Sequence, residues 1–220
     1  MNAFREFLQE RGLEILRCLG QHVYLTVVAM ALAIAVAVPL GLVLTRTKRF
    51  SGPVIAAVGA IQTLPSLALI ALMVMWIAAG PTACITALFL YALLPIVRNT
   101  YTGVMGVDPA MIEAARGMGM TSTQILLRVE LPLSVPVIMA GIRTSTIICV
   151  GIATIGGIVN AGGLGSLIWK GLDRSNDALI YAGALPAMAL ALLLDRVLAL
   201  GERVFTPEGL RQAGMSTNRS

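Results

Sequence analysis

Long stretches without a single charged side chain dominate this sequence. No Asp, Glu, Lys or Arg occurs in 18–45, 50–97, 144–169 or 178–194. A helix that spans a bilayer needs about 20 mostly apolar residues, and these windows supply that length several times over. Only 12% of the residues are charged, whereas soluble domains carry about 25%, so a large soluble protein could not solvate its outer helices. We therefore expect an all-α protein that crosses a membrane several times.

The uncharged window 50–97 decides how many spans there are. Its 48 residues would make about 72 Å of helix, more than twice a hydrocarbon core of about 30 Å. The chain must reverse there once, and Gly80-Pro81 is a typical turn sequence. About five spans follow, at 23–44, 54–79, 82–97, 135–159 and 178–200.

The distribution of basic residues predicts the orientation. With the N-terminus outside, the inner segments hold ten Lys and Arg residues and the outer segments hold five. Because basic residues favour the cytoplasmic side, we expect an external N-terminus and a cytoplasmic C-terminus. The chain then divides into an N-terminal segment (1–21), a transmembrane domain (22–202) and a cytoplasmic tail (203–220).

The N-terminal segment has the pattern of an amphipathic helix. Phe4, Leu8, Ile15 and Leu19 recur at helical spacing among Arg and Glu residues, which predicts a helix lying on the membrane surface. No small-residue cleavage site follows a short apolar region, so we do not expect a cleaved signal peptide.

Residue types that carry chemistry are sparse. Cys18, Cys84 and Cys149 are too scattered for a metal motif and are expected to be small core residues. His22 is the only histidine, and an interfacial polar role is favoured over a catalytic base. No Gly-rich loop ends in Gly-Lys-Ser/Thr, so the chain has no such motif for ATP. The net charge of +5 is spread over loop ends and does not indicate a nucleic acid partner. We expect neither an enzyme, nor a metal, nor a cofactor in this chain.

The loop at 98–134 is the one sizeable polar stretch between spans. Asp108 is expected to cap a short helix that begins with Pro109. Gly117 and Gly119 either end this helix or let another backbone approach closely. A second helix is expected at 122–129, stopped by Leu131-Pro132. Small side chains at a bend between two short helices suit docking into a groove on a partner protein.

This loop resembles the EAA motif of ABC-importer permeases. Glu113-Ala114-Ala115 is followed after three residues by Gly119, and then at the family spacing by Val129 and Leu131-Pro132. The one departure is Val129, where the family has Ile. The resemblance implies a type I ABC-importer transmembrane domain in a bacterial cell membrane. It also implies that Glu113 to Gly119 form the coupling helix, which sits in a cleft of a separate cytosolic ATPase subunit that binds the ATP.

A narrower resemblance concerns the substrate class. The runs 62–69, 91–101, 160–165 and 206–210 are similar to permeases for osmoprotectants, which import glycine betaine, carnitine, choline and related quaternary ammonium compounds. Some of those relatives carry a fused substrate-binding domain after the last span. Only about 20 residues follow here, so a separate binding protein is implied. An importer of another small zwitterion or amino acid is the alternative, and a non-transport membrane protein is a third.

Polar residues inside the second span point to the translocation path. Gln62, Thr63, Pro65 and Ser66 lie mid-span, where polar groups face a cavity or other helices rather than lipid. A kinked pore or gate element and simple back-bonding of Ser and Thr to the helix are both open. Five spans are few for a complete pathway, so a second permease chain, identical or closely related, is expected to complete it.

Overall fold

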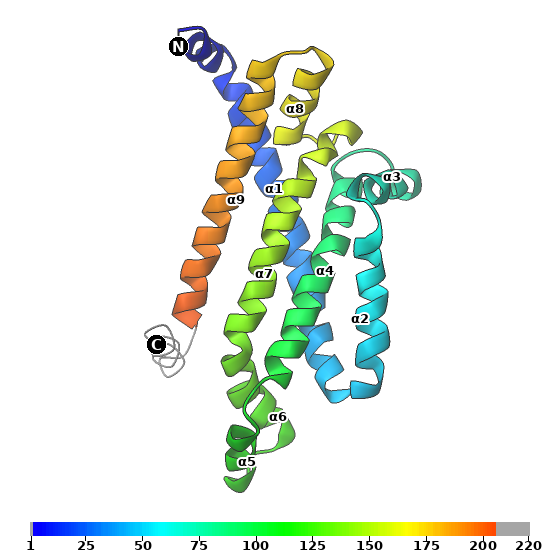
Figure 1. The fold of residues 1–220 in the computed structure, drawn as a ribbon, viewed down its shortest axis with the longest axis vertical. Coiled ribbons are helices and arrows are strands. Elements are labelled where there is room, and N and C mark those ends of the chain that lie inside the picture. The colour runs from blue at the N-terminus through cyan, green and yellow to red at the C-terminus, as the bar shows by residue number, and fades with distance from the viewer. Residues whose placement is uncertain (1, 206–220) are drawn as a thin grey trace, which may run out of the picture.

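The computed structural model describes residues 2–205, and this part of the chain consists of helices joined by short turns (Figure 1). The α-helices are α1 (Asn2–Arg46), α2 (Lys48–Thr63), α3 (Ser66–Ile77), α4 (Pro81–Met105), α5 (Pro109–Gly117), α6 (Ser122–Ile125), α7 (Leu131–Ala153), α8 (Leu164–Asp173) and α9 (Asp177–Phe205). A π-helical segment, η1 (Leu126–Glu130), joins α6 to α7, and a 3-10 segment, η2 (Ile155–Val159), follows α7. The expected all-α class is confirmed.

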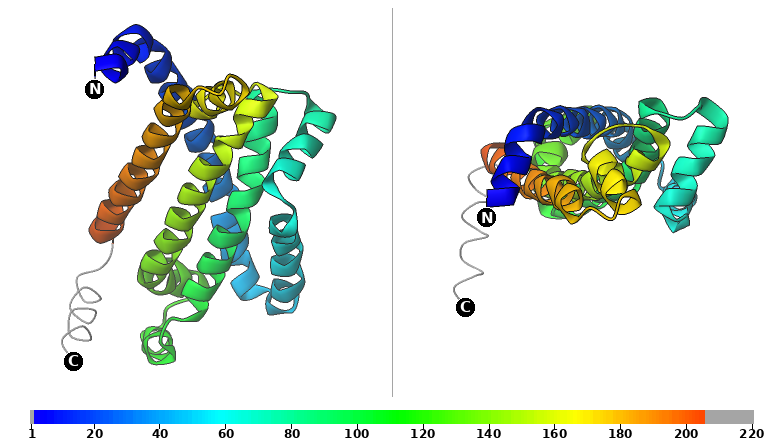
Figure 2. Two further views of the ribbon diagram at one scale, coloured as in Figure 1. Left: turned by 45° about the horizontal axis from the view of Figure 1, so that its top comes forward. Right: turned by 90° about the horizontal axis from the view of Figure 1, so that it is seen from above.

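The long helices run up and down along the long axis of the molecule. Four helical stretches are long and apolar enough to cross a bilayer: Arg11–Arg46, Pro81–Met105, Ser122–Ala153 and Asp177–Glu202. The pair α2 and α3 supplies a fifth candidate, broken by a bend of 96°. About five spans are thus confirmed. The first turns of α1 and the end of α9 lie at opposite ends of the molecule, and α3 lies across its long axis (Figures 1 and 2).

Two helices continue beyond their expected ends. The helix that follows Gly80 begins at Pro81, one residue before the expected start, and it continues to Met105 instead of ending at Val97. The helix that begins at Ser122 does not stop at Leu131-Pro132 and runs on to Ala153. The physical reason is the π turn, in which the Leu131 N–H bonds to the carbonyl of Leu126. Pro132 then falls in the first turn of α7, where a missing N–H costs little.

The core lies where α4 passes between α1 and α7. Small residues let these backbones approach closely, as in other membrane helix pairs. A Cβ on Gly41 would stand 2.6 Å from the Cβ of Thr100, and one on Gly141 would stand 2.7 Å from the Pro95 carbonyl oxygen. The buried side chains of the central cluster include Leu25, Ala29, Ala33, Leu88, Ala92, Ile96, Ile142 and Cys149. All three cysteines are buried and free.

The N-terminal segment is continuous with the first span. The helix α1 has no break between Asn2 and Arg46. Ile15 and Leu19 pack against a buried cluster that Cys18 forms with residues of α8 and α9, so these two side chains contact protein. Leu13, by contrast, is 85% exposed. The side chains of Phe4 and Leu8, and the whole of 206–220, lie outside the described residues. A surface location for the segment stays a prediction.

Candidate functional site

The short helix α5 stands at the end of the molecule opposite the first turns of α1 (Figure 1). Its start is as expected: the Asp108 side chain accepts a hydrogen bond of 2.9 Å from the backbone N–H of Ala110, and Pro109 is the first helical residue. A carboxylate at this position also interacts favourably with the positive end of the helix dipole. The helix is therefore fixed at its N-terminus by its own sequence.

Gly119 ends α5 in a Schellman motif. The N–H of Met120 bonds to the carbonyl of Ala115 (3.2 Å), and the N–H of Gly119 bonds to the carbonyl of Arg116 (2.9 Å). This geometry places Gly119 at φ +79°, which glycine adopts without strain. Gly117 is different, because it is an ordinary last helical residue and a Cβ there would meet nothing within 4 Å. Gly119 thus ends the helix, and the surface at Gly117 is open.

The motif residues of α5 divide between an outer and an inner side. Glu113, Ala114 and Gly117 are exposed, while Ala115 is only 1% exposed. Two large apolar side chains, Met111 and Met118, are also exposed here, at 47% and 75%. The exposed side of α5 thus carries apolar side chains next to a carboxylate.

Leu131 and Pro132 are not part of this exposed surface. Both are half-buried in the first turn of α7, and Leu131 packs against the central core. Since Ser122–Ala153 is one helical stretch, the end of the loop is joined to the core by a continuous rod. The two ends of the motif therefore lie in different environments. The α5 end is on the surface, and the Leu131-Pro132 end is attached to the core.

An ion pair near α5 was not predicted from the sequence. Glu130, at the end of η1, is only 4% exposed, and both of its carboxylate oxygens accept hydrogen bonds from the Arg46 guanidinium. Arg46 is the last residue of α1. The pair therefore joins the end of α1 to η1, within the helical stretch Ser122–Ala153. A cavity of about 170 Å³ lies beside it, lined also by Ile112 and Arg116 of α5. The two partners are 84 positions apart in the sequence, so no local spacing pattern indicated this contact.

The polar residues predicted for the translocation path lie at the elbow between α2 and α3. Leu64 stands between the two helices in an extended conformation, as expected for a residue before proline. The Gln62 side chain donates a 2.8 Å hydrogen bond to the Tyr91 carbonyl, and the Tyr91 hydroxyl donates to the Leu64 carbonyl. The elbow is thereby attached to α4. Tyr91 is 6% exposed.

The other predicted path residues have separate environments. The Thr63 hydroxyl donates to the Ala60 carbonyl at 2.7 Å, which is the local back-bonding considered above. Pro65 is exposed at the bend, and Ser66 is half-buried at the first position of α3. The elbow thus brings only Gln62 of the four into contact with another helix through a hydrogen bond.

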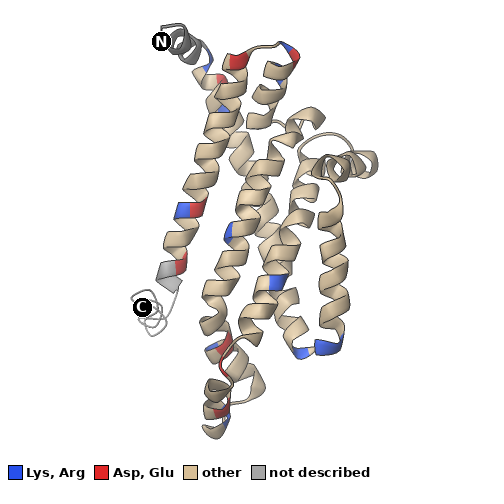
Figure 3. Cartoon of the chain, viewed as in Figure 1, with Lys and Arg blue, Asp and Glu red and all other residues tan. Residues whose placement is uncertain are grey.

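A second ion-pair cluster joins α7 to α9. The Arg143 guanidinium lies 2.9 Å from Asp195 and 3.2 Å from Glu202. The arginine therefore pairs with two carboxylates of its own chain. Figure 3 shows that most charged residues lie toward the two ends of the molecule, whereas the helices between them carry few.

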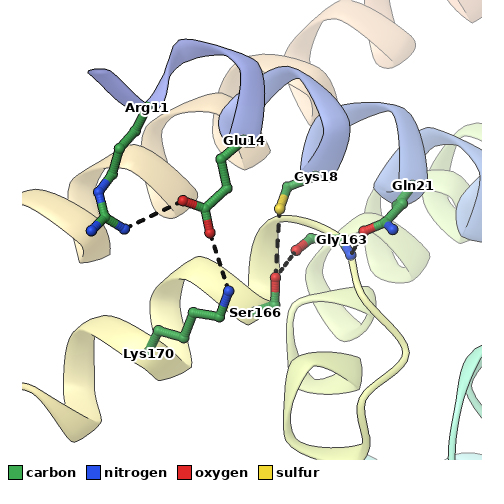
Figure 4. A network of polar contacts seen from close by, with 7 residues as sticks. All are labelled: Arg11, Glu14, Cys18, Gln21, Gly163, Ser166 and Lys170. Atoms are coloured by element: carbon green, nitrogen blue, oxygen red, sulfur yellow. Dashed lines mark hydrogen bonds and ion pairs between the residues drawn. The ribbon is translucent and has the colours of Figure 1, made fainter. Parts of the chain in front are cut away.

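At the opposite end, the first span is bonded to the η2–α8 region (Figure 4). The Lys170 ammonium lies 3.1 Å from Glu14, which also pairs with Arg11 at 3.3 Å. The N–H of Gly163 donates to the Gln21 side chain at 3.1 Å. Deeper in, a ring nitrogen of His22 lies 3.1 Å from the Val150 carbonyl oxygen. These contacts use His22 structurally, and the turn at Gly163 is held against α1.

Comparison with known proteins identifies the class to which this fold and loop belong. Residues 23–205 match the family described as binding-protein-dependent transport system inner membrane component. The chain belongs to this family, so it is the membrane-spanning permease component of a binding-protein-dependent ABC importer and not the ATPase.

Individual relatives are similar over nearly their whole length. The glycine betaine/carnitine/choline transport system permease protein OpuCB of Bacillus subtilis is 47% identical, over 96% of this chain and 97% of the relative. The choline transport system permease protein OpuBB of the same organism is 46% identical, over 96% and 98%. The permease fold also matches inward-facing structures of the MetNI methionine ABC transporter, with a TM-score of 0.79, 24% identity, and coverage of 87% of this chain and 96% of that one.

Proposed function

We propose that this permease admits osmoprotectants with a quaternary ammonium group, such as glycine betaine, carnitine or choline, into a bacterial cell. The observation that carries the proposal is identity of 45–47% over at least 96% of the chain to three permeases named for these compounds. The methionine transporter supports the fold only, since its identity is 24%.

In this proposal α5 faces the cytosol and docks into the ATPase subunit, which binds the ATP. Three features support this role. Glu113 and Ala114 are exposed, the helix is closed by its own cap and Schellman motif, and Met111 and Met118 add apolar surface around it. The same orientation puts the N-terminus outside and the end of α9 inside. It also puts the basic residues Arg46 and Lys48 on the cytosolic side, as the distribution of charge favours.

Movement of α5 would reach the spans through two connections. The first is the helical stretch Ser122–Ala153, which begins at the end of the loop and reaches the core through Leu131. The second is the Arg46–Glu130 pair, which ties the rod to α1. Since Glu130 is almost fully buried, its carboxylate depends on Arg46 as a partner. ATP-driven displacement of α5 would thus shift α1 and α7 together.

The elbow at Gln62–Ser66 is the part of the pathway that we assign to gating. A broken span can change its angle without loss of helical hydrogen bonds, because the break at Leu64 is already present. A second copy of this permease, or a close relative, would complete the pathway. A separate binding protein would deliver the cargo from outside.

Uptake measurements test the proposed cargo. A bacterial strain without its own osmoprotectant uptake would express the chain with its ATPase and binding protein. Labelled glycine betaine, choline and carnitine should accumulate, and growth at high salt should be restored by them. Amino acids such as methionine serve as the comparison set. Accumulation of an amino acid without any quaternary ammonium compound would favour the alternative cargo class.

A further inference from the structure

A cavity of about 330 Å³ opens between η2 and α8, at the end of the molecule opposite α5. In the proposed orientation this is the outer end, where cargo arrives. Its volume is at the lower bound of the roughly 300–1,000 Å³ found for small-molecule sites. Its walls include Asn160 on the η2 side, and Trp169, Lys170 and Asp173 on α8. It lies apart from the elbow and from the coupling helix.

The backbone around this cavity is closely packed. A Cβ on Gly157 would stand 2.5 Å from the carbonyl carbon of Gly165, so only glycine allows η2 to approach α8 this closely. The indole N–H of Trp169 donates to the Thr154 carbonyl at 3.3 Å. This bond fixes the ring by its edge, and the side chain stays 37% exposed. An aromatic ring is thus held at the rim of the cavity.

The two charged residues that line the cavity differ in their partners. The ammonium of Lys170 is turned to Glu14 of α1, 3.1 Å away (Figure 4). Asp173 is exposed and makes no ion pair with any other residue in the described range 2–205. Trp169 and Asp173 are four positions apart on α8, so they share one face of the helix. The cavity therefore combines an aromatic ring with an unpaired carboxylate.

We propose that this cavity is a weak outer site for the quaternary ammonium group of the cargo. Such a group has no N–H to donate, and aromatic faces and carboxylates are the partners that attract it. Trp169 would contact the methyl groups through its ring, and Asp173 would supply the opposite charge. The proposal rests on the proposed function and adds a location on this chain where cargo leaving the binding protein is first held.

Direct binding to the permease–ATPase complex without the binding protein tests this site. Tetramethylammonium and choline would be titrated into the complex in lipid nanodiscs, with saturation-transfer NMR of their methyl protons as the signal. The matched probe is the uncharged alcohol in which carbon replaces the nitrogen of choline. We expect saturable binding of both cations at millimolar concentrations and none of the alcohol. This comparison uses the unaltered protein and needs no variant to fold.

Variants then assign the contacts. Trp169→Ala and Asp173→Asn should each weaken choline binding about fivefold, the effect of losing one contact of about 1 kcal/mol. Trp169→Phe keeps a ring and should retain most of the binding. Asp177→Asn removes an exposed carboxylate that does not line the cavity, and it should change nothing. Equal binding of the uncharged alcohol, or unchanged affinity in Asp173→Asn, would overturn the proposal.

Two other outcomes have distinct meanings. If Asp173→Asn weakens association with the binding protein and leaves choline binding intact, the cavity receives a basic side chain of that protein and the cargo site is refuted. If cells accumulate choline while the complex shows no saturable binding, the outer site fails and the proposed function stands. Absence of uptake for every quaternary ammonium compound would instead remove the proposed function itself.

Discussion

The Gln62 side chain donates a 2.8 Å hydrogen bond to the backbone carbonyl of Tyr91. In an uninterrupted α-helix that carbonyl would accept from the N–H four residues later, and that residue is Pro95, which has none. The broken span therefore supplies a donor to a carbonyl that α4 leaves free. The Tyr91 hydroxyl completes the connection by donating to the Leu64 carbonyl.

Removal of the Tyr91 hydroxyl should loosen the elbow. Tyr91→Phe keeps the ring, so the packing against α3 is preserved. The Leu64 carbonyl, however, loses the hydrogen bond from the Tyr91 hydroxyl. Side-chain hydrogen bonds between membrane helices contribute about 0.6 to 2 kcal/mol, and we expect a loss of stability in this range together with reduced uptake. Thermal unfolding of the purified chain and transport at matched membrane levels are the measurements.

The matched control is Tyr101→Phe, a change on the same helix. Tyr101 is half-buried, and its hydroxyl bonds to no other group among residues 2–205. This variant should unfold and transport like the unaltered chain. Equal behaviour of the two variants would mean that the Tyr91–Leu64 bond has no role in the elbow.

A charge reversal on the exposed side of α5 should disconnect the ATPase. Glu113→Lys alters an exposed side chain that has no ion pair within the described chain, so the protein should still insert into the membrane. We expect loss of uptake and loss of co-purification of the ATPase subunit. Asp177→Lys, at the other end of the molecule, is the control. Undiminished co-purification with normal uptake of Glu113→Lys would refute the coupling role.

The two glycines of the loop should respond differently to substitution. At Gly119 the backbone is left-handed, so Gly119→Val forces strain of about 1 to 2 kcal/mol and should open the Schellman end of α5, abolishing uptake. Gly117→Ala adds a methyl group to open space in a helical residue and should not lower the stability of the chain. If Gly117→Ala nevertheless prevents ATPase binding at full stability, the partner approaches closely at that point.

Thiol labelling tests the proposed orientation. The three native cysteines, all buried, would be replaced, and single cysteines introduced at Ser175 or Ser122, which are both exposed. In intact cells an impermeant thiol reagent should label Ser175→Cys and leave Ser122→Cys unlabelled. Labelling of both after permeabilisation shows that each site is reactive. External labelling of Ser122→Cys would place α5 outside and exclude an ATPase partner there.

Local signals in the sequence predicted the parts of the fold that depend on neighbouring residues. The turn before Pro81, the Asp108 cap and the end of α5 at Gly119 each follow from the backbone preferences of one or two residues. Pro65 indicated a possible kink in the second span, with local back-bonding of Ser and Thr as the alternative, and the structure has a full break there. The size of the bend was not predictable, since it depends on bonds to Tyr91 on another helix.

The wrong boundary at Leu131-Pro132 has a related cause. Proline usually stops a helix. Here a π turn comes just before it, and Pro132 lies in the first turn of α7, where its missing N–H leaves little unsatisfied. No composition rule distinguishes these two cases. Arg143 likewise finds its partners 52 and 59 positions away, and Glu130 finds Arg46 at 84. Such pairs are invisible to spacing rules because they are set by tertiary packing.

The affinity for cargo should reside mainly in the separate binding protein. A permease must release the cargo that it admits. A site with micromolar affinity has a binding free energy of about 8 kcal/mol and would retain cargo, whereas a millimolar site, at about 4 kcal/mol, would release it. Calorimetry of the permease–ATPase complex alone should show no micromolar binding of glycine betaine or choline. The binding protein should bind the same compounds tightly.

Saturable micromolar binding to the complex alone would contradict this division. The aromatic residues of the spans would then become the candidates for a site, and their positions differ. Trp76 on α3 is 81% exposed, whereas Tyr91 on α4 is buried beneath the elbow. Phe89 packs against the central core. Substitution of Trp76 would be the first variant to measure, because its ring is accessible and its loss leaves the Tyr91 contacts in place.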